Sequence, residues 1–152
     1  MNAIILYRLG RWCLLHNIPF LPKVVQNLIF LMYNSYIPLS AEIGEGTVFA
    51  YGGIGVVIHA QAKIGGGCVI GQGVTVGAAE AFASSLPNKC PVIFDNCYIG
   101  AGARLLGDIT IGSGCQIGAG SVVLSSIPDH SVVAGIPAKV LKASPADYRA
   151  IR

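Results

Sequence analysis

The sequence predicts an all-β solenoid, a fold in which short strands coil around a shared interior. Between Ile93 and Ser126, a branched aliphatic residue opens every sixth position, and glycine often follows it. These aliphatic positions are Ile93, Ile99, Leu105, Ile111, Ile117 and Val123. A six-residue period matches neither an amphipathic helix nor a strand with alternating side chains. It is typical of a solenoid in which each hexapeptide forms one side of a coil.

The composition supports a single folded domain. Of the 152 residues, 53% are hydrophobic and 11% are charged, which excludes a disordered chain. The net charge is +3 and the basic residues are scattered, so we expect no nucleic-acid partner. The five cysteines form no CxxC pair, so we expect neither a disulfide framework nor a metal site. The sequence shows no signal peptide and no run long enough to span a membrane, which favours a cytoplasmic protein.

Residues 1–36 differ from the repeat that follows them. Their apolar residues recur with helical spacing on both sides of a proline-containing turn, which predicts two short helices. One possible role is to cap the open end of the solenoid, because terminal coils need a cover. The other is peripheral contact with the inner face of the cytoplasmic membrane, helped by Trp12 and the basic residues Arg8, Arg11 and Lys23. The two roles can coexist.

The repeat region, which we place at residues 37–142, fills about four coils of three hexapeptides each. Assigning successive hexapeptides to three sides predicts three interior columns of apolar residues. These columns are Ile43, Ile64, Ile93 and Ile111; Phe49, Ile70, Ile99 and Ile117; and Ile58, Val76, Leu105 and Val123. The same register predicts that Cys68, Cys97 and Cys115 stack in the interior as packing residues, with neighbours separated by about one strand spacing of 4.8 Å.

Two interruptions break the six-residue count. The first is a glycine-rich bulge within residues 50–57, and the second is an extruded loop at residues 77–92. Regular coils mainly pack, so we expect chemistry where the regularity is broken. Both interruptions adjoin the third side, which also carries His59.

The chain leaves the coil after Val123 through proline-containing turns and an extended segment. Residues 143–152 then form a tail for which we predict a short helix. Ser144 is the expected N-cap of this helix, and Pro145 is its expected first residue.

The hexapeptides, the segment 117–123 and the exit segment 134–139 resemble the hexapeptide-repeat acyltransferases with a left-handed β-helix. Three further segments are similar to the serine acetyltransferase-like branch, which includes O-acetyltransferases of colanic acid and other exopolysaccharides. They are residues 41–46, 55–59 and 72–77. The resemblance covers nearly all of residues 37–142.

This resemblance implies a homotrimer of left-handed coils, with acetyl-CoA in the groove between two neighbouring β-helices. By matching positions, it implies that acetyl-CoA is bound by Ala101, Ala119, Leu124, Ser125 and Lys139. Small residues at the corners let pantetheine approach the backbone, and a cation suits the CoA phosphates. Corner geometry alone is the alternative explanation for the two alanines.

Acetyl transfer from a thioester to a hydroxyl needs a base for the hydroxyl proton. Histidine is the natural base near neutral pH, and the chain has three. We expect His59 to be the base, because it lies beside both interruptions; a structural corner histidine is the alternative. His16 is expected on the polar face of a helix. His130 lies in the exit turn, and we consider it the weaker catalytic candidate.

The chain departs from serine acetyltransferases at two positions of the motif. Those enzymes carry an Asp-His pair where this chain has Tyr51-Gly52 or its neighbour, and a loop histidine near Cys90. Tyr51 is therefore a candidate to orient the base or to stack on a sugar, and Cys90 is a possible acyl carrier. Direct transfer without an acyl carrier remains the main expectation.

These departures favour an acetyl-CoA-dependent O-acetyltransferase acting on a sugar hydroxyl in the biosynthesis of a surface polysaccharide (exopolysaccharide, capsule or O-antigen). The expected acceptor is a sugar or a lipid-linked glycan. One alternative is a serine O-acetyltransferase of cysteine biosynthesis. An alternative from another class is a non-catalytic trimeric β-helix scaffold.

Overall fold

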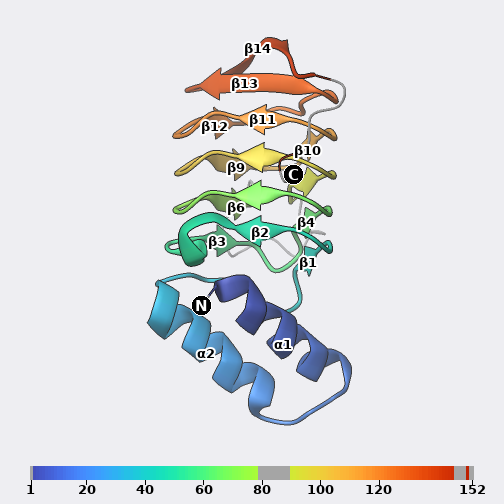
Figure 1. Cartoon of the computed structure of the whole chain (residues 1–152). Helices are drawn as coiled ribbons and strands as arrows, with labels where there is room; N and C mark the ends of the chain where they lie inside the picture. Colours follow the sequence, from blue (N-terminus) through green and yellow to red (C-terminus); the bar gives the residue numbers. More distant parts are fainter. Residues whose placement is uncertain (1, 79–89, 146–149, 151–152) are drawn as a thin grey trace.

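A computed structural model describes residues 2–78, 90–145 and 150, and shows a helical hairpin below a stack of β-coils (Figure 1). The helices are α1 (Ala3–Leu15) and α2 (Leu21–Tyr33), and a short 3₁₀ turn, η1 (Ala50–Gly53), interrupts the first coil. The strands are β1 (Glu42–Ile43), β2 (Val48–Phe49), β3 (Val57–Ile58), β4 (Lys63–Ile64), β5 (Val69–Ile70), β6 (Thr75–Gly77), β7 (Val92–Ile93), β8 (Tyr98–Ile99), β9 (Arg104–Leu106), β10 (Thr110–Ile111), β11 (Gln116–Ile117), β12 (Val122–Val123), β13 (Ser131–Gly135) and β14 (Ala138–Ala143).

The strands form three sheets, one on each side of the solenoid, and their strand pairs are parallel except for β13 with β14. The first sheet has the order β1-β4-β7-β10 and the third has the order β3-β6-β9-β12. The second sheet has the order β2-β5-β8-β11-β13-β14. In each sheet the predicted interior residues are paired one coil apart, as in Ile64↔Ile93 and Ile99↔Ile117. The predicted register of three columns and four coils is therefore confirmed.

The second residue of each short strand points into the solenoid, and the first points outward. Ile58, Ile70 and Leu105 are fully buried, whereas the outward-facing Val57 and Arg104 are exposed. The coils also approach closely at their corners. A Cβ on Gly100 would lie 2.5 Å from the backbone nitrogen of Ala119 in the next coil. Glycine at this position is needed for the coils to stack.

The three interior cysteines form the column that the register predicts. Cys68, Cys97 and Cys115 are fully buried. The backbone N–H of Cys97 donates to the Cys68 sulfur at 3.4 Å, and the Cys97 thiol donates to the Gly112 carbonyl at 3.0 Å. These cysteines are free thiols that pack the interior and link successive coils.

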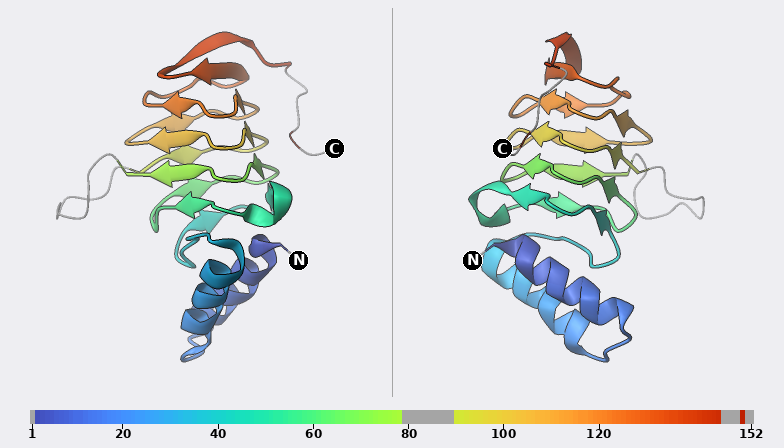
Figure 2. Two further views of the ribbon diagram at one scale, coloured as in Figure 1. Left: turned by 90° about the vertical axis from the view of Figure 1, so that its left-hand side faces the viewer. Right: turned by 45° about the vertical axis from the view of Figure 1, so that its right-hand side comes forward.

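Both predicted N-terminal helices are present, and each has a recognisable start. The side chain of Asn2 caps α1 by accepting a hydrogen bond from the N–H of Ile4 at 3.1 Å. Pro22 lies in the first turn of α2, where its missing N–H costs nothing, and Asn34 ends α2 in the left-handed conformation. The end of the hairpin where the two helices join projects away from the coils (Figure 2).

The hairpin is fixed to the first coil by polar side chains of α1. Tyr7 donates to the carbonyl of Ala41 at 2.6 Å, and Arg8 donates to the carbonyls of Ile43 and Gly44. Arg11 donates to the carbonyls of residues 39, 40 and 41, the last of which also accepts from Tyr7. Arg8 and Arg11 therefore bind the protein backbone, and their expected use as cations facing a membrane is not supported. No helix within the described ranges is both long enough and apolar enough to cross a bilayer.

The exit segment extends the second sheet beyond the predicted repeats. Strand β13 pairs parallel to β11, and β14 then returns antiparallel to β13. The N–H of Ser144 donates to the carbonyl of His130 at 2.6 Å, which ties the end of β14 to the coil. Most of the predicted tail helix, residues 146–149 and 151–152, lies outside the described residues. The same is true of residues 79–89 of the expected loop.

Candidate active site

The two interruptions flank the third sheet at opposite edges. The turn η1 lies at the corner where the chain passes from the second sheet to the third, between β2 and β3. The second interruption follows β6, at the corner where the chain passes from the third sheet to the first. The third sheet therefore separates two edges, and each edge carries some of the predicted site residues.

One edge, which we call the Tyr51 edge, carries Tyr51, Ala101, Ala119 and Lys139. Tyr51 is in η1, and the two alanines lie in the equivalent turns of the third and fourth coils. The N–H of Gly120 donates to the carbonyl of Ala101 at 2.8 Å, so these turns stack directly. Lys139 is paired with Ala134, whose methyl group lies above Gly118 beside this stack.

The other edge, which we call the His59 edge, carries His59, Cys90, Leu124 and Ser125. His59 follows β3, and Cys90 lies just before β7. Leu124 and Ser125 follow β12, in the fourth coil, and both are exposed. The residues that the resemblance assigned to acetyl-CoA are thus divided between two edges of one chain.

The His59 edge brings a thiol against an imidazole. The sulfur of Cys90 lies 3.0 Å from Nδ1 of His59, although the two residues are 31 positions apart. The backbone N–H of His59 donates to the carbonyl of Val76 at 2.8 Å, which holds the histidine on the coil above. Cys90 is buried with 8% of its surface exposed, and this desolvation raises the pKa of its thiol. The thiol is therefore protonated near neutral pH.

The backbone N–H of Gln61 indicates which tautomer the imidazole of His59 adopts. The backbone N–H of Gln61 donates to His59 Nδ1 at 3.3 Å. Because a backbone N–H can only donate, Nδ1 carries the lone pair, and the proton of the neutral ring is on Nε2. The Cys90 thiol then donates to the same nitrogen. This is the arrangement of a nucleophile beside its base.

Tyr51 is not brought to His59 within one chain. Its side chain is 79% exposed, and its backbone is in the left-handed region with φ 51°. It lies at the start of the third side of the first coil, whereas His59 lies at the end of that side. A role for Tyr51 in orienting His59 would therefore require a second copy of the chain.

The other two histidines lie away from both edges. His16 contacts the carbonyl of Trp12 through Nδ1 at 2.8 Å, and its ring lies 4.3 Å from that of Trp12. His130 is in a turn between the first and second sheets with φ 52°, packed on Gly114. Its Nδ1 is buried without a hydrogen-bond partner in the described part of the chain.

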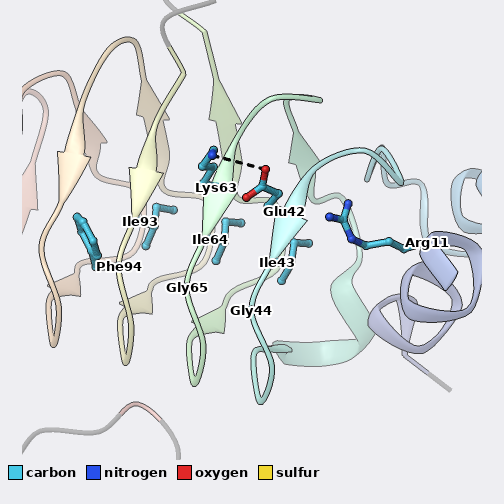
Figure 3. A pocket seen from close by; sticks show the side chains of 9 residues that line it. All are labelled: Arg11, Glu42, Ile43, Gly44, Lys63, Ile64, Gly65, Ile93 and Phe94. Atoms are coloured by element: carbon cyan, nitrogen blue, oxygen red, sulfur yellow. Dashed lines mark ion pairs between the residues drawn. The ribbon is translucent and has the colours of Figure 1, made fainter. Parts of the chain in front are cut away.

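A groove that the sequence did not reveal lies on the first sheet (Figure 3). It has a volume of about 320 Å³, and its charged lining residues are Arg11, Glu42 and Lys63. Lys63 and Glu42 form an ion pair at 3.5 Å on the surface. The N–H of Lys63 also donates to the carbonyl of Pro91, so the groove starts beside the His59 edge.

Comparisons with known proteins agree with this architecture. Residues 90–125 match the bacterial transferase hexapeptide family, described by six repeats. A serine acetyltransferase of Synechococcus elongatus is 37% identical over 143 residues, covering 94% of this chain and 57% of that protein. The chain carries the repeat of the hexapeptide transferases. A serine acetyltransferase of Bacillus pumilus is 36% identical over 93% of the chain and 63% of its own length, and that of Escherichia coli is 34% identical over 96% and 52%.

Solved structures of serine acetyltransferases superpose on this hexapeptide-repeat protein. One in complex with cysteine has a TM-score of 0.85 at 32% identity, covering 98% of this chain and 56% of that one. One in complex with CoA has a TM-score of 0.78 at 33% identity, covering 91% and 55%. The enzyme of Vibrio cholerae has a TM-score of 0.84 at 34% identity, covering 95% and 55%. These neighbours imply left-handed coils, and the chain spans little more than half the length of most of them.

The comparisons correct the expected acceptor. The expectation of a sugar hydroxyl in surface-polysaccharide synthesis is wrong, because relatives over nearly the whole chain are named serine acetyltransferases. A sugar or lipid-linked glycan partner is likewise unsupported. The replacements at Tyr51 and Cys90 change individual side chains, whereas the likeness to serine acetyltransferases extends through both edges.

The contact between Cys90 and His59 was also missed, although the repeat register contained a signal for it. Val92 pairs with Lys63, and counting back along both strands places Cys90 beside Gln61, two residues from His59. Extending the register through the end of the loop would have revealed the pair.

Proposed function

We propose that the chain is an acetyl-CoA-dependent serine O-acetyltransferase. In this reaction the acetyl group passes from the CoA sulfur to the serine hydroxyl oxygen, which gives O-acetylserine and free CoA. The observation that carries the proposal is the likeness to serine acetyltransferases, which covers 93–96% of this chain in the sequence comparisons quoted above and includes both edges of the third sheet. His59 is the base of the reaction, because its Nδ1 has a lone pair and lies at an interruption of the repeat.

The Tyr51 edge fits the donor. Gly102 and Gly120 have left-handed backbones, and a Cβ on either would meet only open space. The edge between Ala101 and Gly120 therefore has almost no side chains, so an extended pantetheine arm can lie against its backbone. Lys139 is exposed at the end of this edge, where its ammonium group suits the CoA phosphates.

The division of the site between two edges supports a homotrimer. The two edges of one chain are separated by the third sheet, so the predicted donor residues do not form one continuous surface within one chain. A threefold axis parallel to the long axis of the solenoid lets the Tyr51 edge of one protomer face the His59 edge of the next. Leu124 and Ser125 then complete the donor site from the neighbouring chain. The free thiols of all five cysteines fit the reducing cytoplasm, where we place this activity.

The test is the release of free CoA from acetyl-CoA with serine, threonine or a nucleotide sugar as acceptor. We expect release that depends on serine, with O-acetylserine identified by mass spectrometry. His59→Ala should lower the rate about 100-fold or more, whereas the matched variant His16→Ala should retain it. Absence of serine-dependent release would overturn the assignment. Complete absence of acetyl-CoA turnover would favour the scaffold alternative.

A further inference from the structure

The end of the helical hairpin where α1 and α2 join leaves apolar side chains uncovered. We call residues 12–24 the hairpin tip, and it projects away from the coils (Figure 2). Six of its thirteen residues are large hydrophobics exposed to solvent: Trp12, Leu14, Leu15, Phe20, Leu21 and Val24. Soluble proteins rarely gather large apolar side chains in this way, and such a surface usually marks an interaction site.

Packing within the hairpin does not need these side chains. Its interior is formed by other residues, among them the buried Tyr7, Val25 and Ile29. Phe20 is the clearest case, because 86% of its surface is exposed and its φ is 61°. Glycine adopts a positive φ at lower cost than a bulky residue. Neither packing nor backbone conformation favours an aromatic residue there, which points to a role in binding.

The net charge of the chain is concentrated at the same end. Residues 1–41 contain three basic residues and no acidic residue, whereas the rest of the chain contains seven of each. Lys23 lies in the hairpin tip and is exposed. Arg8 and Arg11 donate to neutral carbonyls, so they keep their charge and add to the positive potential. An anionic surface complements this potential, whereas a second hairpin would bring like charges together.

The expected arrangement of the subunits suits a flat partner. In the trimer proposed above, the threefold axis runs parallel to the long axis of the solenoid, so all three hairpin tips lie at one end of the particle. One planar surface can contact the three tips together, which strengthens weak individual contacts. Each helix has 13 residues, too few to span a hydrocarbon core of about 30 Å. Contact is therefore with the surface of a bilayer.

We propose that the hairpin tip is a peripheral docking surface for an anionic lipid bilayer. Trp12, Leu15 and Phe20 enter the boundary between headgroups and acyl chains, where their apolar surface is removed from water. Lys23 pairs with the lipid phosphates. The coils remain in water, so docking holds the enzyme at the membrane without occupying either edge of the third sheet. The inference concerns location, and it does not depend on which acceptor is acetylated.

The experiment mixes the full chain with vesicles of phosphatidylcholine, alone or with phosphatidylglycerol, and measures binding by flotation. We expect binding to the anionic vesicles, weaker binding to the neutral ones, and a decrease as the salt concentration rises. Trp12 is the single tryptophan of the chain, so its emission reports on the tip and should shift to shorter wavelength on binding. Absence of binding to the anionic vesicles at low salt would overturn the inference.

Leu15 and Leu141 provide a matched pair of variants. Their exposed fractions are 66% and 64%, but Leu141 lies in β14, at the opposite end of the coil stack (Figure 1). Leu15→Gln should weaken vesicle binding about tenfold, whereas Leu141→Gln should bind as wild type. Phe20→Gly tolerates the positive φ, so it should weaken binding by a similar factor without losing helix content in circular dichroism. Equal vesicle binding by the two glutamine variants would contradict the proposal.

Sedimentation in the absence of lipid separates a bilayer from a second copy as the occupant. We expect wild type and Leu15→Gln to have the same mass. A smaller assembly in Leu15→Gln would show that the tip joins copies of the chain, and it would overturn the proposal. Serine-dependent release of CoA, measured without vesicles, should be unchanged in Leu15→Gln. Failure of that reaction in wild type would remove the proposed function and leave the vesicle result standing.

Discussion

At the scale of single residues, the contact between Cys90 and His59 involves a protonated thiol. The imidazole has its lone pair on Nδ1, and burial disfavours the thiolate. A thiolate–imidazolium pair would instead have a depressed thiol pKa and would react with alkylating agents at low pH. The two states can therefore be distinguished by titration.

We expect the alkylation of Cys90 by iodoacetamide to have its midpoint above the ordinary thiol pKa of about 8.5. The folded-state pKa is raised, so the thiol stays protonated, and slow to react, at pH values where a free thiol has begun to ionise. Peptide mass spectrometry over a pH series measures the rate at Cys90 alone. The urea-unfolded chain is the control and should show the ordinary midpoint. A midpoint near pH 6 would indicate an ion pair and contradict the neutral assignment.

A second residue-scale prediction concerns the close approach of successive coils. Gly100→Ala should lower the free energy of unfolding by about 1–3 kcal/mol, because the new methyl group would meet the backbone nitrogen of Ala119. A side chain could rotate away from the new methyl group, but this backbone nitrogen cannot. Urea unfolding measures the effect, with Ala119→Ser at the exposed neighbouring turn as the control. Equal stability of the two variants would show that the coils can separate locally.

At the scale of elements, the hairpin is joined to the coils by apolar packing and by guanidinium groups that donate to backbone carbonyls. A helical pattern identifies α1 and α2, because apolar residues recur with the period of a helix. It does not show where an arginine on the polar face points. Arg8 and Arg11 look like solvent-facing cations in the sequence, and only the fold places backbone carbonyls within their reach.

Arg11→Ala should loosen the hairpin from the first coil. It removes charged donors to the carbonyls of residues 39–41, an interaction worth about 1–3 kcal/mol. Hydrogen exchange should increase in α1 and in residues 39–46, while exchange in the upper coils stays unchanged. Lys23→Ala, at an exposed position of α2, is the matched control. If hydrogen exchange in both variants equals that of wild type, apolar packing alone holds the hairpin.

Elements outside the six-residue period were the ones that the sequence did not specify. The three columns and the cysteine stack follow from counting, because each hexapeptide occupies one side and the register cannot slip without exposing isoleucines. Strand β13 continues the second sheet, yet the exit segment has no hexapeptide pattern to show it. The period places Cys90 beside Gln61, two residues from His59, but it does not show that the two side chains turn toward each other.

At the scale of the whole molecule, the acceptor was the property least accessible to sequence reasoning. The hexapeptide pattern reflects the packing of the interior. The same packing can support a site for serine or a site for a sugar. Replacements at Tyr51 and Cys90 predict a different acceptor only if those two side chains select it, and the sequence does not show which residues contact the acceptor. The distribution of site residues over two edges likewise becomes visible only when the coils are stacked.

A subunit-mixing experiment tests whether two protomers share one site. Ala119→Trp should block the Tyr51 edge, and His59→Ala should disable the other edge, so each variant alone should be inactive. In randomly mixed trimers, about a quarter of the sites combine an intact edge from each partner and should recover that fraction of wild-type activity. Each variant mixed with itself is the control. Mixed trimers without recovered activity would show that each site lies within one protomer.

The reversed strand β14 has a consequence for how the molecule ends. A parallel coil finishes with unpaired N–H and C=O groups that match the start of another coil, so a bare stack invites end-to-end growth into fibres. Strand β14 runs antiparallel to β13 at the outer position of the second sheet, and it carries Lys139 and Lys142. A further parallel coil finds neither the right direction nor an uncharged edge there. At the opposite end, Tyr7, Arg8 and Arg11 occupy carbonyls of the first coil. Strand β14 and the helical hairpin thus cover the two ends of the coil stack, which favours a particle of fixed length over a filament.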